Sequence, residues 1–153
     1  MSETVTITNP EQYLPHREPM LLVDRLENVV PGVSGEAVKV FPAGHRVFEG
    51  HMPGAPILPG VMLVEAIAQA GAIVLLAKNG PPPPGRAGEH GHFAMIRNVK
   101  FKKPVYPGME VRMKVKLTDA TQAPFYTITG RAFADGQLAA TAEVVITVPE
   151  GLV

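Results

Sequence analysis

The sequence predicts an α+β domain in which an antiparallel sheet of about six strands wraps around one long central helix. One stretch, Val61 to Ala77, is apolar on nearly every face, which is typical of a helix that other elements surround. The segments beyond residue 90 instead alternate apolar and polar residues, as half-buried strands do. The length of 153 residues suits one domain over residues 1–153.

Two strands are expected before the helix, at residues 20–30 and 33–41, with a proline-glycine turn between them. The segment 50–60 contains three prolines and three glycines. Because proline lacks the N–H that regular elements need, this segment is expected to form a rigid loop. The helix should begin after Pro59-Gly60 and end near residue 80, where asparagine and glycine favour a helix C-terminus.

Four more strands are expected after the helix, at residues 92–101, 109–118, 125–134 and 137–148. The last two flank Asp135-Gly136, which is a strong signal for a two-residue hairpin turn. The predicted strand at 109–118 shows the clearest alternation, with apolar side chains on one face and basic side chains on the other.

The composition excludes several classes of function. Hydrophobic residues make up 46% of the chain and charged residues 18%, which is typical of a protein with a packed core. Fourteen basic residues balance fourteen acidic ones, so no global charge attracts nucleic acid or an anionic membrane. The absence of cysteine excludes disulfides, thiolate nucleophiles and cysteine-ligated metals.

The location of the protein is inferred from two negative signals. The first residues show no basic region followed by an apolar run, so we expect no secretory signal and a cytoplasmic location. The apolar stretch Val61 to Ala77 has 17 residues and contains Glu65 and Gln69, whereas a membrane span needs roughly 20 apolar residues. We therefore expect a buried helix and no membrane insertion.

Glu65 and Gln69 are the polar residues of the predicted helix, and their spacing of four places them on one face. Burial raises the pKa of a carboxyl above its reference of ~4.3, which keeps the group protonated and suits a general acid. A structural Glu65, bonded to the backbone or to Gln69, fits the same spacing. Position on the helix leaves both interpretations open.

His51 is the strongest candidate base, because the proline-glycine loop around it would hold the imidazole in a fixed place. His45 is a weaker candidate for the same role, and His16 is interpreted as structural. His90 and His92 form an H-x-H pair that lacks a third ligand at a recognisable spacing, so no metal site is predicted.

The N–H groups of Gly60 and Val61 open the predicted helix. Unpaired N–H groups and the positive end of the helix dipole favour developing negative charge there, so these two residues form a candidate oxyanion site. An ordinary helix start after a turn has the same sequence, and that interpretation also stays open.

Three ordered motifs together resemble the 3-hydroxyacyl-acyl-carrier-protein dehydratases of the FabZ type, a hot-dog fold family. They are LPHREPMLLVDR at 14–25, GHMPGAPILPGVMLVEAIAQ at 50–69 and FKKPVYPG at 101–108. The resemblance includes the fourteen positions from His51 to Glu65. It implies a hot-dog fold and elimination of water from a 3-hydroxyacyl thioester.

The resemblance also implies a role for each candidate residue. His51 would be the base, Glu65 the acid and the Gly60 N–H the donor to the thioester oxygen, with Gln69 orienting Glu65. Val61 would stand beside that donor, and a tunnel lined by Ile57, Leu58 and the helix would hold the acyl chain. No cofactor or metal is required.

Several residues of this chain differ from those of the families it resembles. The related dehydratase-isomerases have Asp at the helix position and a loop cysteine, whereas this chain has Glu65 and no cysteine, which favours dehydration without isomerisation. Met52 replaces the usual Phe, and Arg97 stands where the family has Asp. The linker 78–93 is long and rich in proline. These departures concern acyl-chain preference and pathway.

A run of basic residues suggests a partner. Between residues 97 and 116 there is a single acid, Glu110, and seven basic residues: Arg97, Lys100, Lys102, Lys103, Arg112, Lys114 and Lys116. The run is either a solvated strand face or a docking patch for the acidic acyl carrier protein that the resemblance implies, with Lys102 and Lys103 at its centre. Nucleic acid is not expected, because the 109–118 strand has no stacking aromatics.

The resemblance further implies a homodimer in which the loop histidine of one chain faces the helix carboxylate of the other. Trimers of such dimers are common in that family. Two other functions stay open from the sequence: a hot-dog thioesterase, in which His51 is dispensable, and an acyl-carrier-binding module without catalysis.

Overall fold

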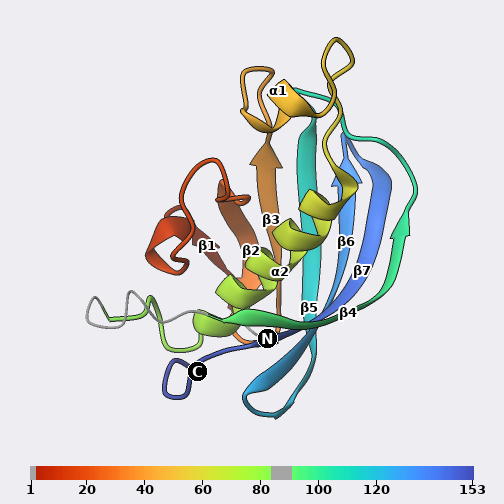
Figure 1. Cartoon of the computed structure of the whole chain (residues 1–153). Helices are drawn as coiled ribbons and strands as arrows, with labels where there is room; N and C mark the ends of the chain where they lie inside the picture. Colours follow the sequence, from red (N-terminus) through yellow and green to blue (C-terminus); the bar gives the residue numbers. More distant parts are fainter. Residues whose placement is uncertain (1–2, 84–90) are drawn as a thin grey trace.

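The computed structural model describes residues 3–83 and 91–153, which form one antiparallel sheet curved around a central helix (Figure 1). The strand order is β1-β2-β3-β5-β6-β7-β4. The strands are β1 (Val5–Ile7), β2 (Arg25–Val30), β3 (Ser34–Val40), β4 (His92–Phe101), β5 (Glu110–Gln122), β6 (Phe125–Ala134) and β7 (Gln137–Thr147). The helices are α1 (Val47–Gly50) and the long α2 (Gly60–Leu76), and a 3-10 turn covers Pro10–Gln12.

The core lies between α2 and the concave face of the sheet (Figure 1). Ile67 and Ile73 of α2 are fully buried, as is Ile128 of β6. The helix lies so close to β6 that a Cβ on Gly130 would be 2.4 Å from Cγ2 of Ile67. A helix buried on this many sides has no need of a polar face, which explains the apolar sequence of α2.

The predicted sheet and helix are confirmed, with seven strands in place of six. β4 and β6 have the predicted bounds, and Asp135 and Gly136 both have positive φ, as the hairpin turn between β6 and β7 requires. The extra strand is β1, three residues that pair with β2. So short a strand shows no periodicity in the sequence.

Two predicted boundaries were wrong. Residues 20–24 are not part of β2, because the backbone of Met20 and Leu22 hydrogen-bonds to the side chain of Gln69 and does not join a ladder. β5 continues to Gln122, where it pairs with Phe125 of β6, although its last residues are polar and lack the apolar alternation. None of the helices within the described residues combines the length and apolar character of a membrane span.

Candidate active site

The side chain of Gln69 is buried, and both its amide oxygen and its amide nitrogen are hydrogen-bonded. Its Oε1 accepts from the N–H of Leu22 at 2.8 Å, and its Nε2 donates to the carbonyl of Met20 at 2.9 Å. The same Nε2 donates to Oε1 of Glu65 at 2.9 Å. The side chain is 2% exposed, so these bonds are shielded from water. Gln69 therefore fixes the segment around Met20 against α2 and holds the carboxylate of Glu65.

Glu65 lies about one helical turn before Gln69, with 24% of its side chain exposed. Its Oε1 also lies 3.4 Å from Nε2 of His16. Burial is the largest influence on the pKa of Glu65 and raises it. The hydrogen bonds from His16 and Gln69, with the charge of His16, outweigh burial and bring the pKa below its ordinary value of 4.5.

The raised pKa expected from the sequence is therefore wrong. The spacing placed Gln69 beside Glu65, but His16 comes from a segment 49 residues away and shows no local signal. The sequence signal for a role of His16 was its position in the motif at residues 14–25, which also contains Arg17 and Pro19. Nδ1 of His16 is buried and has no hydrogen-bond partner among the described residues.

His51 follows α1 and is anchored by the loop after it. Its Nδ1 lies 2.8 Å from the carbonyl oxygen of Ile57, and its own carbonyl accepts from the N–H of Ile57 at 3.0 Å. A carbonyl oxygen can only accept, so Nδ1 carries the hydrogen of the neutral ring and Nε2 is left with the free lone pair. The predicted rigid loop is thus what sets the tautomer of His51.

Gly60 and Val61 are the first two residues of α2, so their N–H groups have no acceptor within the helix. The cap residue Pro59 supplies no side-chain hydrogen bond to them. The ring of Phe101 lies against Gly60, where a Cβ would approach Cε1 of that ring to 2.8 Å. Glycine at position 60 thus lets the end of β4 approach the N-terminus of α2.

A groove that is partly open to solvent is lined by Glu65 and His16. Its α2 wall consists of Glu65, Ala68, Gln69, Ala72 and Leu76, which share one helix face. Sites for small ligands are commonly lined by apolar side chains with a few polar groups, as this groove is. Ile57 and Leu58, the residues expected to line the tunnel, are not among the residues that line this groove. Leu58 is buried and donates its N–H to the carbonyl of Val105.

His92 also lines the groove, whereas His45 does not. His45 is buried between the rings of Phe41 and Phe48, and its Nδ1 accepts from the N–H of Val47. His90 of the predicted H-x-H pair lies outside the described residues. Within the described ranges, no group of three ligating side chains could hold a metal ion.

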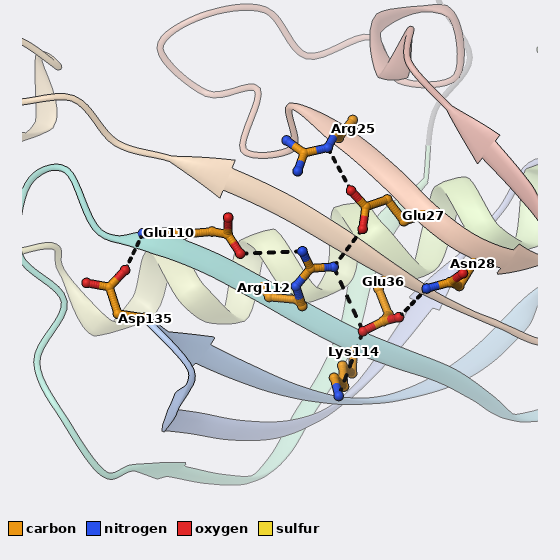
Figure 2. Close-up of polar contacts among 8 residues, drawn as sticks. All are labelled: Arg25, Glu27, Asn28, Glu36, Glu110, Arg112, Lys114 and Asp135. Carbon is orange, nitrogen blue, oxygen red and sulfur yellow. Dashed lines mark hydrogen bonds and ion pairs between the residues drawn. The ribbon is translucent and has the colours of Figure 1, made fainter.

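The basic run divides into paired and unpaired members. Figure 2 shows the guanidinium of Arg112 between Glu27, Glu36 and Glu110, with Lys114 also beside Glu36. Arg97 pairs with Glu143. These residues belong to a mixed-charge strand surface. Lys100, Lys102, Lys103 and Lys116 form no ion pair with the described residues, and all four are exposed.

One chain does not bring the two strongest candidates together. No hydrogen bond or ion pair joins His51 to Glu65 in the part of the chain that is described, and His51 does not line the groove that Glu65 opens. Glu65, its partners Gln69 and His16, and the groove form one cluster. His51 and its loop form another.

Comparison with protein families matches residues 14–143 to the FabA-like domain. The chain is 39% identical over 140 residues to a 3-hydroxyacyl-[acyl-carrier-protein] dehydratase FabZ of Ligilactobacillus salivarius, covering 90% of this chain and 94% of that protein. It is also 39% identical to proteins of the same name from Roseiflexus sp., covering 92% and 94%, and from Janthinobacterium sp., covering 95% and 91%.

Solved structures show the same fold at low identity. A dehydratase heterocomplex from Xenorhabdus doucetiae superposes with a TM-score of 0.71 at 19% identity, covering 93% of this chain and 91% of that one. A hypothetical thioesterase from Streptococcus pneumoniae has a TM-score of 0.57 at 10% identity, covering 78% and 80%. Since dehydratases and thioesterases share this hot-dog fold, the sequence relatives distinguish the functions and the fold does not.

Proposed function

The chain belongs to the FabA-like family and, within it, to the FabZ-type 3-hydroxyacyl-[acyl-carrier-protein] dehydratases, and from this membership we propose which residues perform the reaction. The enzyme removes water from 3-hydroxyacyl thioesters of acyl carrier protein in fatty-acid biosynthesis. The C2–H and C3–O bonds break, a C2=C3 bond forms, and the hydroxyl leaves as water. The substrate is the (3R) isomer and the product the trans-2-enoyl thioester.

His51 is the base that takes the C2 proton. Its Nδ1–H donates to the carbonyl of Ile57, so Nε2 is the free acceptor. The loop supplies the positioning that a general base needs, because a fixed ring loses little entropy when the substrate binds.

Glu65 is the acid that protonates the departing hydroxyl. Its lowered pKa favours the charged carboxylate, so Glu65 needs a proton source before it can donate. His16 can supply this proton, because its Nε2 lies 3.4 Å from the carboxylate. When His16 is protonated, transfer from Nε2 to Oε1 gives a neutral ring and a neutral carboxyl that then protonates the hydroxyl. Gln69 holds the carboxyl in position throughout.

The N–H of Gly60, with that of Val61 beside it, donates to the thioester oxygen as negative charge develops there. Both groups open α2 and have no acceptor within the helix. The acyl chain extends from Glu65 into the apolar groove along Ala68 and Ala72. The steps use an acid, a base and a donor, and they require neither a metal nor a cofactor.

The active site is shared between two subunits of a homodimer, and β4 supports this proposal. β4 is one of the two edge strands of the described sheet, it is ten residues long, and nine of its residues are exposed. Its exposed side chains include Phe93, Met95 and Ile96. The unpaired backbone groups of a long apolar edge strand can pair with another strand. The β4 strand of a second copy would form such a pair about a twofold axis. His51 of one chain would then meet Glu65 of the other, and such dimers assemble in threes.

Lys102 and Lys103 dock the acyl carrier protein. They follow Phe101, whose ring lies on Gly60, so their charges stand close to the N-terminus of α2, where the thioester is activated. An acidic carrier would be drawn to this point, and complementary charge raises the rate of such encounters.

The observation that carries the proposal is Glu65, held by Gln69 and His16 at the mouth of an apolar groove, in a chain of this family. The test incubates the protein with a 3-hydroxyacyl-carrier substrate and separates the enoyl thioester from free acid. We expect the enoyl thioester. Glu65→Gln and His51→Ala should each lower its formation by ~10²–10⁴-fold without unfolding the protein. Free acid as the product would instead identify a thioesterase.

A further inference from the structure

The two ends of the groove differ in chemistry. Glu65 and His16 form the polar end, and Ala68 and Ala72 continue along the helix with side chains too small to fill the groove. At the other end of this helix face the groove is lined by Leu76, the last residue of α2. An acyl chain that enters beside Glu65 therefore passes the small side chains of Ala68 and Ala72 and then reaches the larger side chain of Leu76.

The C-terminal segment completes the far end. Pro149 and Leu152 line the same groove as Leu76, and Figure 1 shows this segment passing below the C-terminal end of α2. Leu152 is 6% exposed and belongs to the hydrophobic core. Its N–H donates to the carbonyl of Pro149 at 3.3 Å, and the N–H of Val148 donates to the carbonyl of Pro124 at 3.1 Å. The tail is therefore fastened to the fold at this position.

The length of the groove follows from the helix. From Glu65 to Leu76 there are eleven residue steps, which span ~16 Å at about 1.5 Å per residue. The side chain of Leu76 tilts back toward the helix N-terminus, so the open length is ~12 Å. A C–C bond of about 1.5 Å advances an extended chain by roughly 1.25 Å, so about ten carbons fit beyond the carbon next to Glu65.

We propose that Leu76 and Leu152 form an end wall that limits the length of the acyl chain to roughly 12–14 carbons. The inference rests on the proposed function, in which Glu65 contacts the 3-hydroxyl and so fixes where the chain starts. The C-terminal segment is then a determinant of substrate specificity as well as a part of the core.

The test compares kcat/KM for an eight-carbon and a sixteen-carbon 3-hydroxyacyl thioester. The unaltered protein should favour the shorter substrate. Leu152→Ala removes part of the wall and should raise the sixteen-to-eight ratio about tenfold. Ala72→Leu narrows the groove seven residue steps, or ~10 Å, from Glu65 and should lower that ratio about tenfold. Ala72 is only half-buried, so this variant should fold even if Leu152→Ala does not.

Val153→Ala is the matched control. Val153 is the neighbour of Leu152 on the same tail, but it lines an adjacent hollow with Pro124 and Tyr126 and not the groove. Its sixteen-to-eight ratio should equal that of the unaltered protein. Thermal denaturation of each variant shows whether it is folded.

The results separate this inference from the proposed function. If the unaltered protein dehydrates both substrates but folded Leu152→Ala and Ala72→Leu keep its ratio, the end wall is wrong and the function stands. A change of ratio in Val153→Ala as large as in Leu152→Ala also overturns the wall. If the unaltered protein dehydrates neither substrate, the proposed function itself is wrong.

Discussion

Glu65 receives hydrogen bonds from two side chains that come from different parts of the chain. Gln69 is four residues away on the same helix, and His16 lies in the segment that precedes β2. Both stabilise the charged carboxylate against the effect of burial. The site therefore combines a carboxylate that Gln69 holds in place with an imidazole nitrogen 3.4 Å from it.

Replacing His16 by alanine should raise the pKa of Glu65. The variant loses the hydrogen bond and the charge of His16, while burial, which raises the pKa, remains. NMR titration of ¹³C-labelled glutamate carboxyls measures the change directly. Glu27 is the internal control, because Arg112 and Arg25 hold its pKa low at a distance from His16. An unchanged pKa of Glu65 would show that His16 does not act on it.

The same change has a consequence for stability. A carboxyl with a lowered pKa in the folded state stabilises the fold above its unfolded pKa, near 4.5, and this contribution disappears as the pH falls through the folded pKa. The unaltered protein should therefore lose more of its free energy of unfolding on acidification than His16→Ala does. Urea denaturation at neutral and acidic pH supplies the comparison.

At the scale of elements, periodicity and turn chemistry predicted most of the fold. The helix and β6 and β7 follow from apolar runs and from one Asp-Gly turn, all of which are local signals. One departure was non-local. Residues 20–24 were predicted as strand from their composition, but the backbone of Met20 and Leu22 hydrogen-bonds to the side chain of Gln69.

The candidate site divides in the same way. The Gly-Pro loop of His51 and the pairing of Glu65 with Gln69 are properties of neighbouring residues, and both were predicted. The contact with His16 and the position of Leu152 at the groove depend on how distant segments fold together, and no spacing in the sequence predicts them.

The packing of α2 on β6 gives a prediction about stability. Gly130 is buried in β6, and a Cβ there would lie 2.4 Å from the side chain of Ile67, which is fully buried. Gly130→Ala should therefore lower the free energy of unfolding by ~1–3 kcal/mol. Denaturation in urea measures it.

Gly44→Ala is the control for that measurement. Gly44 is exposed, and nothing lies within 4 Å of the Cβ that alanine would add. Its free energy of unfolding should stay within ~0.5 kcal/mol of the unaltered protein. Equal stability of the two variants would contradict the close approach of α2 to β6.

At the scale of the whole molecule, we propose different partners for two surface features. The exposed apolar side chains of the edge strand β4 are assigned to a second copy, and the positive charges of Lys102 and Lys103 to the carrier. The ring of Phe101 on Gly60 joins the end of β4 to the start of α2. The proposed dimer contact and the proposed carrier contact therefore both border the catalytic helix.

Charge reversal tests the carrier contact. Lys102→Glu with Lys103→Glu should lower kcat/KM for carrier-linked substrate about tenfold at low ionic strength, relative to a small thioester analogue, and salt should reduce the difference. The matched control is Lys114→Glu with Lys116→Glu, which changes the charge equally on the β5 surface. Equal losses with both substrates, or in both double variants, would contradict docking at Lys102 and Lys103.

The central claim is that each active site combines His51 of one chain with Glu65 of another. The most direct test mixes His51→Ala chains with Glu65→Gln chains by co-expression or reversible unfolding, and confirms exchange by mass spectrometry. Random pairing makes half of the dimers mixed, and each mixed dimer has one site with both defects and one intact site. About a quarter of the unaltered activity should therefore return. A site built within one chain predicts no activity above that of either parent, and that result would contradict the shared site.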